Sequence, residues 1–274
     1  MVRFDDIIKT EFSEFNTPSD IEAALDTMHR FKTGECDGIG LSPVSKLPAQ
    51  MLILVQVGLR RAIELAEAAV RGINRKNLVT TALLSRGTLE TSCLLWDVMR
   101  KVEKIVQSND TAQLKERHAL MSRSLFGGKA KDVRISEDIE ARNVITIIEG
   151  LSKKLNVPLM GFFERLSEFA HPNYHGMMAT YTDEGAEGGL KTFCDRRTGT
   201  VRPLILTALG TLATSCNIIV ATFETFAARI EGLAVLAERE IYEGGTWPAG
   251  EPYPVVRNCF VSRSATRGVP RELR

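Results

Sequence analysis

Hydrophobic residues recur every three or four positions through most of the chain, which is the spacing of an amphipathic α-helix. The pattern predicts helices over residues 17–31, 49–74, 77–107, 111–125, 136–155 and 159–170, and a last long helix that starts at Pro203 and runs beyond Arg239. Proline residues and glycine-rich stretches fall between these segments, where helices end and begin. We therefore expect an all-α protein, a helical bundle of about six or seven helices.

One segment breaks the helical pattern. Residues 178–182 and 190–194 resemble two short strands on either side of the glycine-rich stretch 183–189. This arrangement predicts a small β-hairpin near 178–194, and such a hairpin needs to pack on helices to be stable.

No linker divides residues 1–243, so we expect a single domain there. Residues 244–274 form a basic tail that contains four of the ten prolines, either a solvated terminus or an arm for an acidic partner.

Residues 203–223 contain no charged side chain and are long enough to span a bilayer. Threonine, serine and asparagine recur within the run, and the helical pattern continues into charged residues such as Glu224 and Arg229. Such a composition favours the buried helix of a bundle over a membrane span. We expect no membrane partner.

Composition and charge narrow the class of protein. The chain is 44% hydrophobic and 25% charged, as in ordinary globular proteins, and its net charge is +1, so any attraction to nucleic acid must be local. The five cysteines include no Cys-x-x-Cys pair, and the first residues lack the apolar run of a signal peptide. These features predict reduced thiols and a cytoplasmic location.

Neither a metal nor a cofactor is expected. His171 and His175 have the spacing of a helical metal pair, but Pro172 breaks the helix between them. The sequence Gly127-Gly128-Lys129 lacks the spacing of a phosphate-binding Walker loop.

The segment 159–176 gathers the candidate chemistry. It holds two of the four histidines, and Pro172 predicts that the preceding helix ends at His171. An imidazole can take or give a proton near neutral pH, and an arginine such as Arg165 can hold a phosphate. Together these groups could cleave RNA at a 2′-hydroxyl without a metal. Six helical positions place Arg165 and His171 about 120° apart, so only a break near His171 would bring them together.

An arginine followed by a histidine near the end of a helix, here Arg165 and His171, resembles the motif of HEPN proteins (higher eukaryotes and prokaryotes nucleotide-binding). Many of these all-helical proteins are ribonucleases of toxin, defence or RNA-processing systems. The resemblance implies catalytic roles for Arg165 and His171, a homodimer that pairs two motifs, RNA as substrate, and a possible antitoxin partner.

Several polar residues could support such a site. Ser167, Asn173 and His175 surround His171, and Ser167 is spaced to share a hydrogen bond with it at the helix end. A second resemblance is to bacterial helical proteins with a Ser-x3-His-Pro segment downstream of an Arg-x3-Glu pair, here Arg86 and Glu90. That pair either meets His171 inside the bundle or forms an exposed couple on its own helix.

Two functions remain open from the sequence. The first is a HEPN-like RNA-binding or metal-independent RNA-cleaving protein of a bacterial defence or toxin type, which makes the chain a candidate endoribonuclease. The alternative is a non-enzymatic binding or assembly protein in which the His-Pro segment has a structural role. The effect of His171→Ala on RNA cleavage and on folding distinguishes them.

Overall fold

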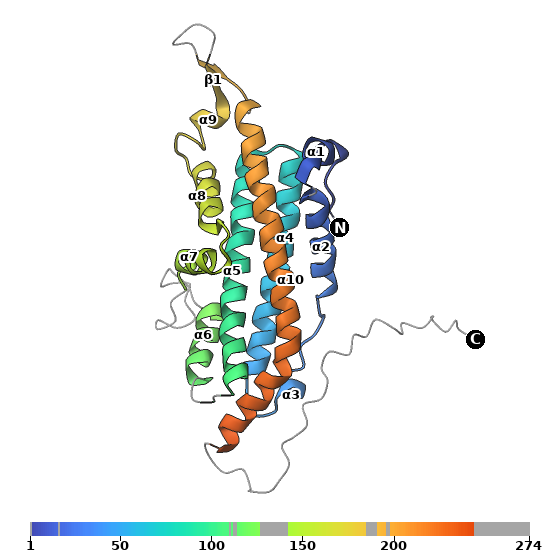
Figure 1. Ribbon diagram of the computed structural model, residues 1–274, viewed down its shortest axis with the longest axis vertical. Coiled ribbons are helices and arrows are strands. Elements are labelled where there is room, and N and C mark those ends of the chain that lie inside the picture. The colour runs from blue at the N-terminus through green and yellow to red at the C-terminus, as the bar shows by residue number, and fades with distance from the viewer. Residues whose placement is uncertain are drawn as a thin grey trace, which may run out of the picture.

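Four helices run side by side and form the centre of the molecule (Figure 1). They are α2 (Thr17–Arg30), α4 (Leu47–Asn74), α5 (Leu78–Ser108) and α10 (Thr198–Glu243). The computed structural model describes residues 2–15, 17–109, 111, 114–126, 142–184, 191–195 and 198–243. Within this part of the chain, α10 packs chiefly against α5 and α2, and α4 packs against α5.

Three shorter helices lie along the outer side of α5 (Figure 1). They are α6 (Leu114–Phe126), α7 (Val144–Leu155) and α8 (Leu159–Ala170). The remaining elements are short: α1 (Asp6–Glu11), the 3-10 turn η1 (Ser13–Phe15), α3 (Gly38–Leu41), α9 (Met178–Tyr181), and the strands β1 (Thr182–Glu184) and β2 (Lys191–Phe193). The prediction of an all-α fold with a small hairpin is confirmed, and seven of the described helices are at least 12 residues long.

Local signals explain where several helices begin and end. The side chains of Asn77 and Asn143 cap α5 and α7 by accepting hydrogen bonds from Thr80 N (3.2 Å) and Ile145 N (3.0 Å). At the other ends of these two helices, Asn109 and Asn156 adopt left-handed backbone conformations. These asparagines set the lengths of α5 and α7.

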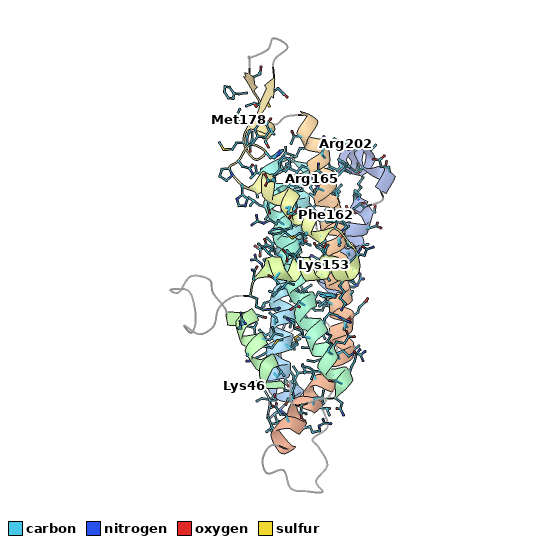
Figure 2. All side chains as sticks on the ribbon, turned by 60° about the vertical axis from the view of Figure 1, so that its left-hand side comes forward. Lys46, Lys153, Phe162, Arg165, Met178 and Arg202 are labelled. Carbon is cyan, nitrogen blue, oxygen red and sulfur yellow. The ribbon has the colours of Figure 1, made fainter. Side chains whose placement is uncertain are left out.

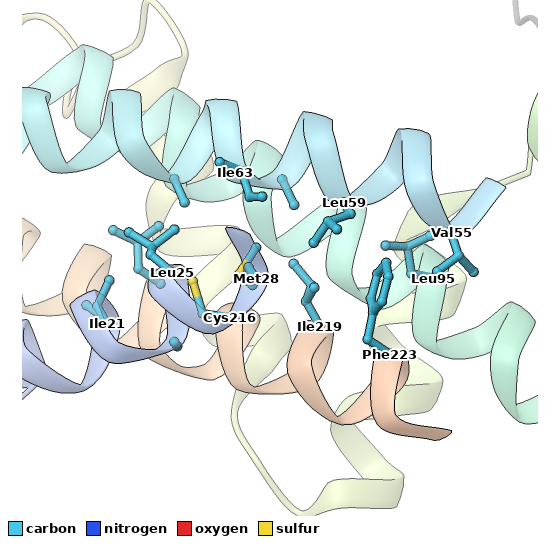
Figure 3. Packing of buried hydrophobic residues seen from close by; sticks show 14 of the residues in the cluster. Ile21, Leu25, Met28, Val55, Leu59, Ile63, Leu95, Cys216, Ile219 and Phe223 are labelled. Atoms are coloured by element: carbon cyan, nitrogen blue, oxygen red, sulfur yellow. The ribbon is translucent and has the colours of Figure 1, made fainter. Parts of the chain in front are cut away.

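The main core lies among the four central helices (Figure 3). Apolar side chains from α2, α4, α5 and α10 meet there, and those labelled in Figure 3 include Leu25, Leu59, Leu95, Cys216 and Ile219. The helices α4 and α5 approach closely at Gly58, where an added Cβ would lie 2.6 Å from Leu95 Cδ2. A second, smaller cluster lies under α7 and α8 and includes Leu89, Ile148 and Leu159. The second cluster attaches the α7–α8 layer to α5.

Two predicted boundaries were wrong. The last helix begins at Thr198 rather than at Pro203. Pro203 therefore lies inside the helix, where it has no N–H group to donate a backbone hydrogen bond. Tertiary contacts support this extra turn: Arg202 Nη2 lies 2.8 Å from Glu14 Oε1, and Thr200 Oγ1 donates to the carbonyl of Ala179 (2.8 Å). The helix predicted from Ser136 begins at Val144 instead, since residues 142 and 143 are not helical. Ser136 itself lies outside the described residues.

The hairpin is shorter than predicted. Thr182–Glu184 pairs antiparallel with Lys191–Phe193, whereas Met178–Tyr181, expected to be strand, forms a helical turn. The hydroxyl of Thr182 closes this turn by donating to the carbonyl of Met178 (2.7 Å). The turn of the hairpin and the basic tail at 244–274 lie outside the described residues.

In the described part of the chain, α10 alone is long and apolar enough to cross a membrane. Within its most apolar window, 61% of the residues are buried against the rest of the protein. The central helix of a bundle has this property too, so length and composition do not distinguish the two situations.

Candidate functional site

The helix α8 carries the residues that resemble the HEPN motif. It ends as predicted: His171 has an extended backbone (φ −90°, ψ 150°), and its N–H donates to the carbonyl of Ser167 (3.0 Å). Leu166 and Phe169 face the main core and hold the helix against it. The side chains of Arg165 and His171 are both exposed.

Arg165 and His171 are not brought together. No hydrogen bond or ion pair joins their side chains, and neither side chain is bonded to another residue in the described ranges. Arg165 lies on the body of α8 (Figure 2), whereas His171 starts the segment that leaves it. Within one copy of the chain, the two groups do not form a preassembled pair.

Asn173 organises the segment after His171. Its Oδ1 accepts a hydrogen bond from Gly176 N (3.0 Å), and its Nδ2 donates to Glu168 Oε2 (2.7 Å). Gly176 is buried against the backbone of α8, and an added Cβ would overlap the carbonyl oxygen of His171. These contacts make the segment a hydrogen-bonded corner in which Asn173 has a structural role.

His175 is a surface residue of the same corner. Its ring lies 5.9 Å from that of Phe169 and 5.5 Å from that of Tyr174. Its carbonyl accepts a hydrogen bond from Thr180 Oγ1 (2.7 Å), which joins the corner to α9. The contacts of His175 are therefore those of a residue that packs the corner.

The pair formed by Arg86 and Glu90 faces α8. Arg86 Nε lies 3.1 Å from Glu90 Oε1, both side chains are about three-quarters buried, and Arg86 Nη1 lies 3.5 Å from Ser167 Oγ. The Arg86 guanidinium also lies over the ring of Phe163, 5.5 Å from its centroid. Ser167 Oγ donates to the carbonyl of Phe163 (2.7 Å) rather than to the side chain of His171. The pair therefore joins α5 to α8 one turn before His171.

A groove that was not predicted from the sequence lies between α5, α6 and α7. Its volume is about 470 Å³, and six of its lining side chains are cationic. These are Arg100, Lys101 and Lys104 on α5, Arg123 on α6, Arg142 before α7, and Lys154 on α7. Among the described lining residues, Asp97 is the one carboxylate. The groove therefore concentrates positive charge that the net charge of the whole chain does not show.

Asp97 holds part of this cationic cluster in place. Its Oδ2 accepts from Lys101 Nζ (2.8 Å) and also bonds Arg142. Partial burial tends to raise the pKa of Asp97, but the hydrogen bonds from Lys101 and Arg142 outweigh it and lower that pKa below its usual value. Asp97 is therefore ionised at neutral pH and fixes both cations.

An aromatic side chain lies in the groove beside these cations. Trp96 is half-buried, with Lys154 Nζ 4.9 Å and the guanidinium carbon of Arg100 5.8 Å from its ring. Two guanidinium nitrogens of the lining, Arg100 Nε and Arg142 Nη1, are buried without a hydrogen-bond acceptor in the described part of the chain. Buried donors of this kind normally have a partner, and these two have none among the described residues.

The sequence did contain a signal for this groove. Arg100, Lys101 and Lys104 follow Trp96 on one helix, but their spacing is also that of an ordinary solvated face. The contribution of Arg142 and Lys154 could not be seen, because these residues are distant in sequence from α5. Only packing of α7 on α5 brings them to Trp96.

Another cavity, of about 260 Å³, is lined by residues such as Arg75, Asn77 and Tyr181 near the start of α5. No group of three or more histidine, cysteine, aspartate or glutamate side chains within the described residues is arranged to hold a metal ion.

The described residues form a helical bundle whose surface carries a cationic groove that contains Trp96. Protein-family models, curated proteins and solved structures contain no match to this chain.

Proposed function

We propose that the protein binds RNA through the groove between α5, α6 and α7. The observation that carries this proposal is a cluster of six cationic side chains against one carboxylate among the described lining residues, in a protein of net charge +1. Lysine and arginine side chains bind the phosphates of nucleic acids and release the counterions held there. The resemblance of residues 159–176 to nucleotide-binding helical proteins favours RNA as the polyanion.

Charge removal within the groove tests the proposal. Lys104 and Lys154 are exposed, so replacing both with alanine removes two cations without disturbing the core. We expect the double variant to bind RNA at least about tenfold more weakly, with a shallower dependence of affinity on salt concentration. Lys153→Ala is the matched control, because Lys153 is exposed on the same helix and does not line the groove. Equal RNA affinities for the double variant and the wild type would contradict the proposal.

A second candidate function is metal-independent RNA cleavage by Arg165 and His171. The exposure of both side chains favours it, because each is free to contact a substrate or a second copy of the chain. A homodimer, as the resemblance implies, is one way to bring an arginine and a histidine to the same phosphate. Sedimentation of the purified protein measures whether it forms.

Cleavage is measured on labelled RNA in the presence of a chelator. His171→Ala and Arg165→Ala should each abolish cleavage, while the helix content measured by circular dichroism and the melting temperature stay unchanged. His175→Ala serves as the control at a neighbouring residue. A wild type that cleaves no RNA at any salt concentration excludes this second function. The corner formed by Asn173, Gly176 and His175 then supports a structural role for the His-Pro segment in a protein that binds without cleaving.

A further inference from the structure

We infer that the groove takes single-stranded RNA, with an unpaired base stacked on Trp96 and the adjacent phosphates held by the surrounding cations. This inference rests on the proposed RNA binding and specifies its substrate class. It depends on three features of the groove, namely the environment of Trp96, the two guanidinium groups held by carboxylates, and the shape of the site.

Trp96 offers a surface whose present partner can be exchanged. Lys154 lies near its ring, is exposed, and forms no ion pair with any described carboxylate. Arg100, by contrast, is anchored by Glu103, whose Oε2 lies 2.5 Å from Arg100 Nη1. A stacked base stabilises a complex more than an exposed cation–π contact does. An incoming base can therefore displace the Lys154 ammonium, which is then free to pair with a phosphate of the same strand.

The guanidinium groups of Arg100 and Arg142 are held ready to bind phosphate. The two arginines come from different segments and both line the groove, and one nitrogen of each, Arg100 Nε and Arg142 Nη1, is buried without a hydrogen-bond partner in the described part of the chain. Glu103 holds one guanidinium group and Asp97 holds the other, so both groups are oriented before a ligand arrives. An RNA phosphate in the groove would accept hydrogen bonds from the exposed parts of these guanidinium groups.

The form of the site favours a single strand over a duplex. A groove of about 470 Å³ is of the size that holds a small-molecule ligand, and its aromatic side chain is half-buried within it. The bases of an RNA duplex are stacked on one another inside the helix, so a duplex would present its phosphates but no free base to Trp96. A single strand can present both.

Binding of matched RNAs tests the inference. Fluorescence anisotropy would compare a labelled single-stranded oligonucleotide, a duplex of the same length, and adenosine monophosphate as competitor. We expect the single strand to bind at least about tenfold more tightly than the duplex, and the mononucleotide to compete poorly because it engages few of the cations. Trp96→Ala should weaken single-strand binding about 5- to 100-fold and leave duplex binding unchanged. Trp96→Phe keeps an aromatic face and should retain most of the affinity.

A spectroscopic readout separates stacking from a purely structural role of Trp96. The chain has two tryptophans, Trp96 and Trp247, so a Trp247→Phe variant reports on Trp96 alone. Its fluorescence should be quenched when the single strand is added and remain constant when the duplex is added. Both Trp96 variants are compared by melting temperature, so that an unfolded protein is recognised.

The possible outcomes distinguish this inference from the function on which it rests. If the wild type binds neither RNA, the proposed function itself fails. If single strand and duplex bind equally, and the Lys104→Ala/Lys154→Ala variant is weakened while Trp96→Ala is not, RNA binding stands and the stacking inference is overturned. Adenosine monophosphate that competes as strongly as the oligonucleotide would overturn the inference in favour of a mononucleotide site. Tighter binding of single-stranded DNA than of RNA would overturn the choice of RNA.

Discussion

At the scale of single residues, Gly176 shows how the end of α8 constrains the chain. It is buried where the chain turns back on His171, and an added Cβ would overlap the His171 carbonyl oxygen and lie 3.1 Å from the carbonyl oxygen of Phe169. Both neighbours are backbone atoms and cannot rotate away. The identity of this residue is therefore set by the backbone of the corner.

Gly176→Ala should destabilise the protein by about 1–3 kcal/mol, because the corner must shift to admit the methyl group. Chemical denaturation measures the loss. Gly161→Ala in α8 is the matched control, since its added Cβ would meet nothing closer than 4.0 Å. There we expect no loss, and a gain of up to about 1 kcal/mol from the higher helix propensity of alanine. Equal stabilities of the two variants would contradict the model of the corner.

Glu238 is a second residue whose environment has a measurable consequence. Its side chain is almost fully buried near the end of α10. Burial raises the pKa of its carboxyl group above the ordinary 4.5, and a hydrogen bond with Ser42 offsets part of that rise. The folded protein therefore disfavours the ionised carboxylate that the unfolded chain carries at neutral pH.

The pKa of the Glu238 carboxyl group is higher in the folded protein than in the unfolded chain. The contribution of this group to the free energy of unfolding is therefore fully present below about pH 4.5, and it is lost as the pH rises through the pKa of the folded protein. Glu238→Gln removes this titration. The variant should be more stable than the wild type at pH 7, with a smaller difference at pH 4, as measured by chemical denaturation. Glu231→Gln, at an exposed position on the same helix, controls for the loss of a charge. A difference that grows toward acidic pH would contradict the expectation.

At the scale of elements, the connection between α4 and α5 depends on a short local signal. Lys76 adopts a left-handed conformation (φ 51°), and Asn77 then caps α5 through its side chain. The same turn returns the chain so that α5 packs along α4. The cap thus contributes to both the start and the direction of a 31-residue helix.

Asn77→Ala should cost about 1 kcal/mol of stability, because it leaves the N–H of Thr80 without its acceptor. Asn77→Asp retains an oxygen at the same place and should keep most of the stability. Thermal or chemical denaturation of the three proteins measures the difference. If the alanine and aspartate variants were equally destabilised, the hydrogen bond to Thr80 would not be the reason.

At the scale of the whole molecule, the central bundle shields its thiols. Cys216 on α10 is completely buried among α2, α4 and α5 (Figure 3), and burial raises its pKa to about 12. Cys93 on α5 is likewise buried and its pKa is raised to about 12, although a hydrogen bond with Ser92 acts in the opposite direction. Cys36 is exposed. Alkylation requires an accessible thiolate, so these thiols should differ in reactivity.

In single-cysteine variants, Cys36 should be alkylated rapidly at pH 8, whereas Cys216 should react only as the bundle unfolds. The rate at Cys216 should therefore rise with denaturant in parallel with global unfolding. Mass spectrometry of the labelled protein follows both. Rapid alkylation of Cys216 without denaturant would show that α10 separates from its neighbours in the native state.

The sequence by itself determined the features that depend on near neighbours in the chain. Helical periodicity placed α4, α5 and α8 within a few residues of their observed bounds, and Pro172 placed the end of α8 at His171. These predictions succeeded because periodicity and the steric effect of proline act within a few residues.

Only the tertiary structure decided what depends on residues far apart. Arg86 and Ser167 meet across 81 positions of sequence, and Arg202 extends α10 by contacting Glu14 near the N-terminus. The groove likewise exists because α7 carries Lys154 to Trp96 on α5. The sequence identified Arg165 and His171 as a possible pair, but the path of the chain after α8 decides that they do not touch. The periodicity of a helix specifies which face is apolar, whereas the choice of partner for that face is made by packing.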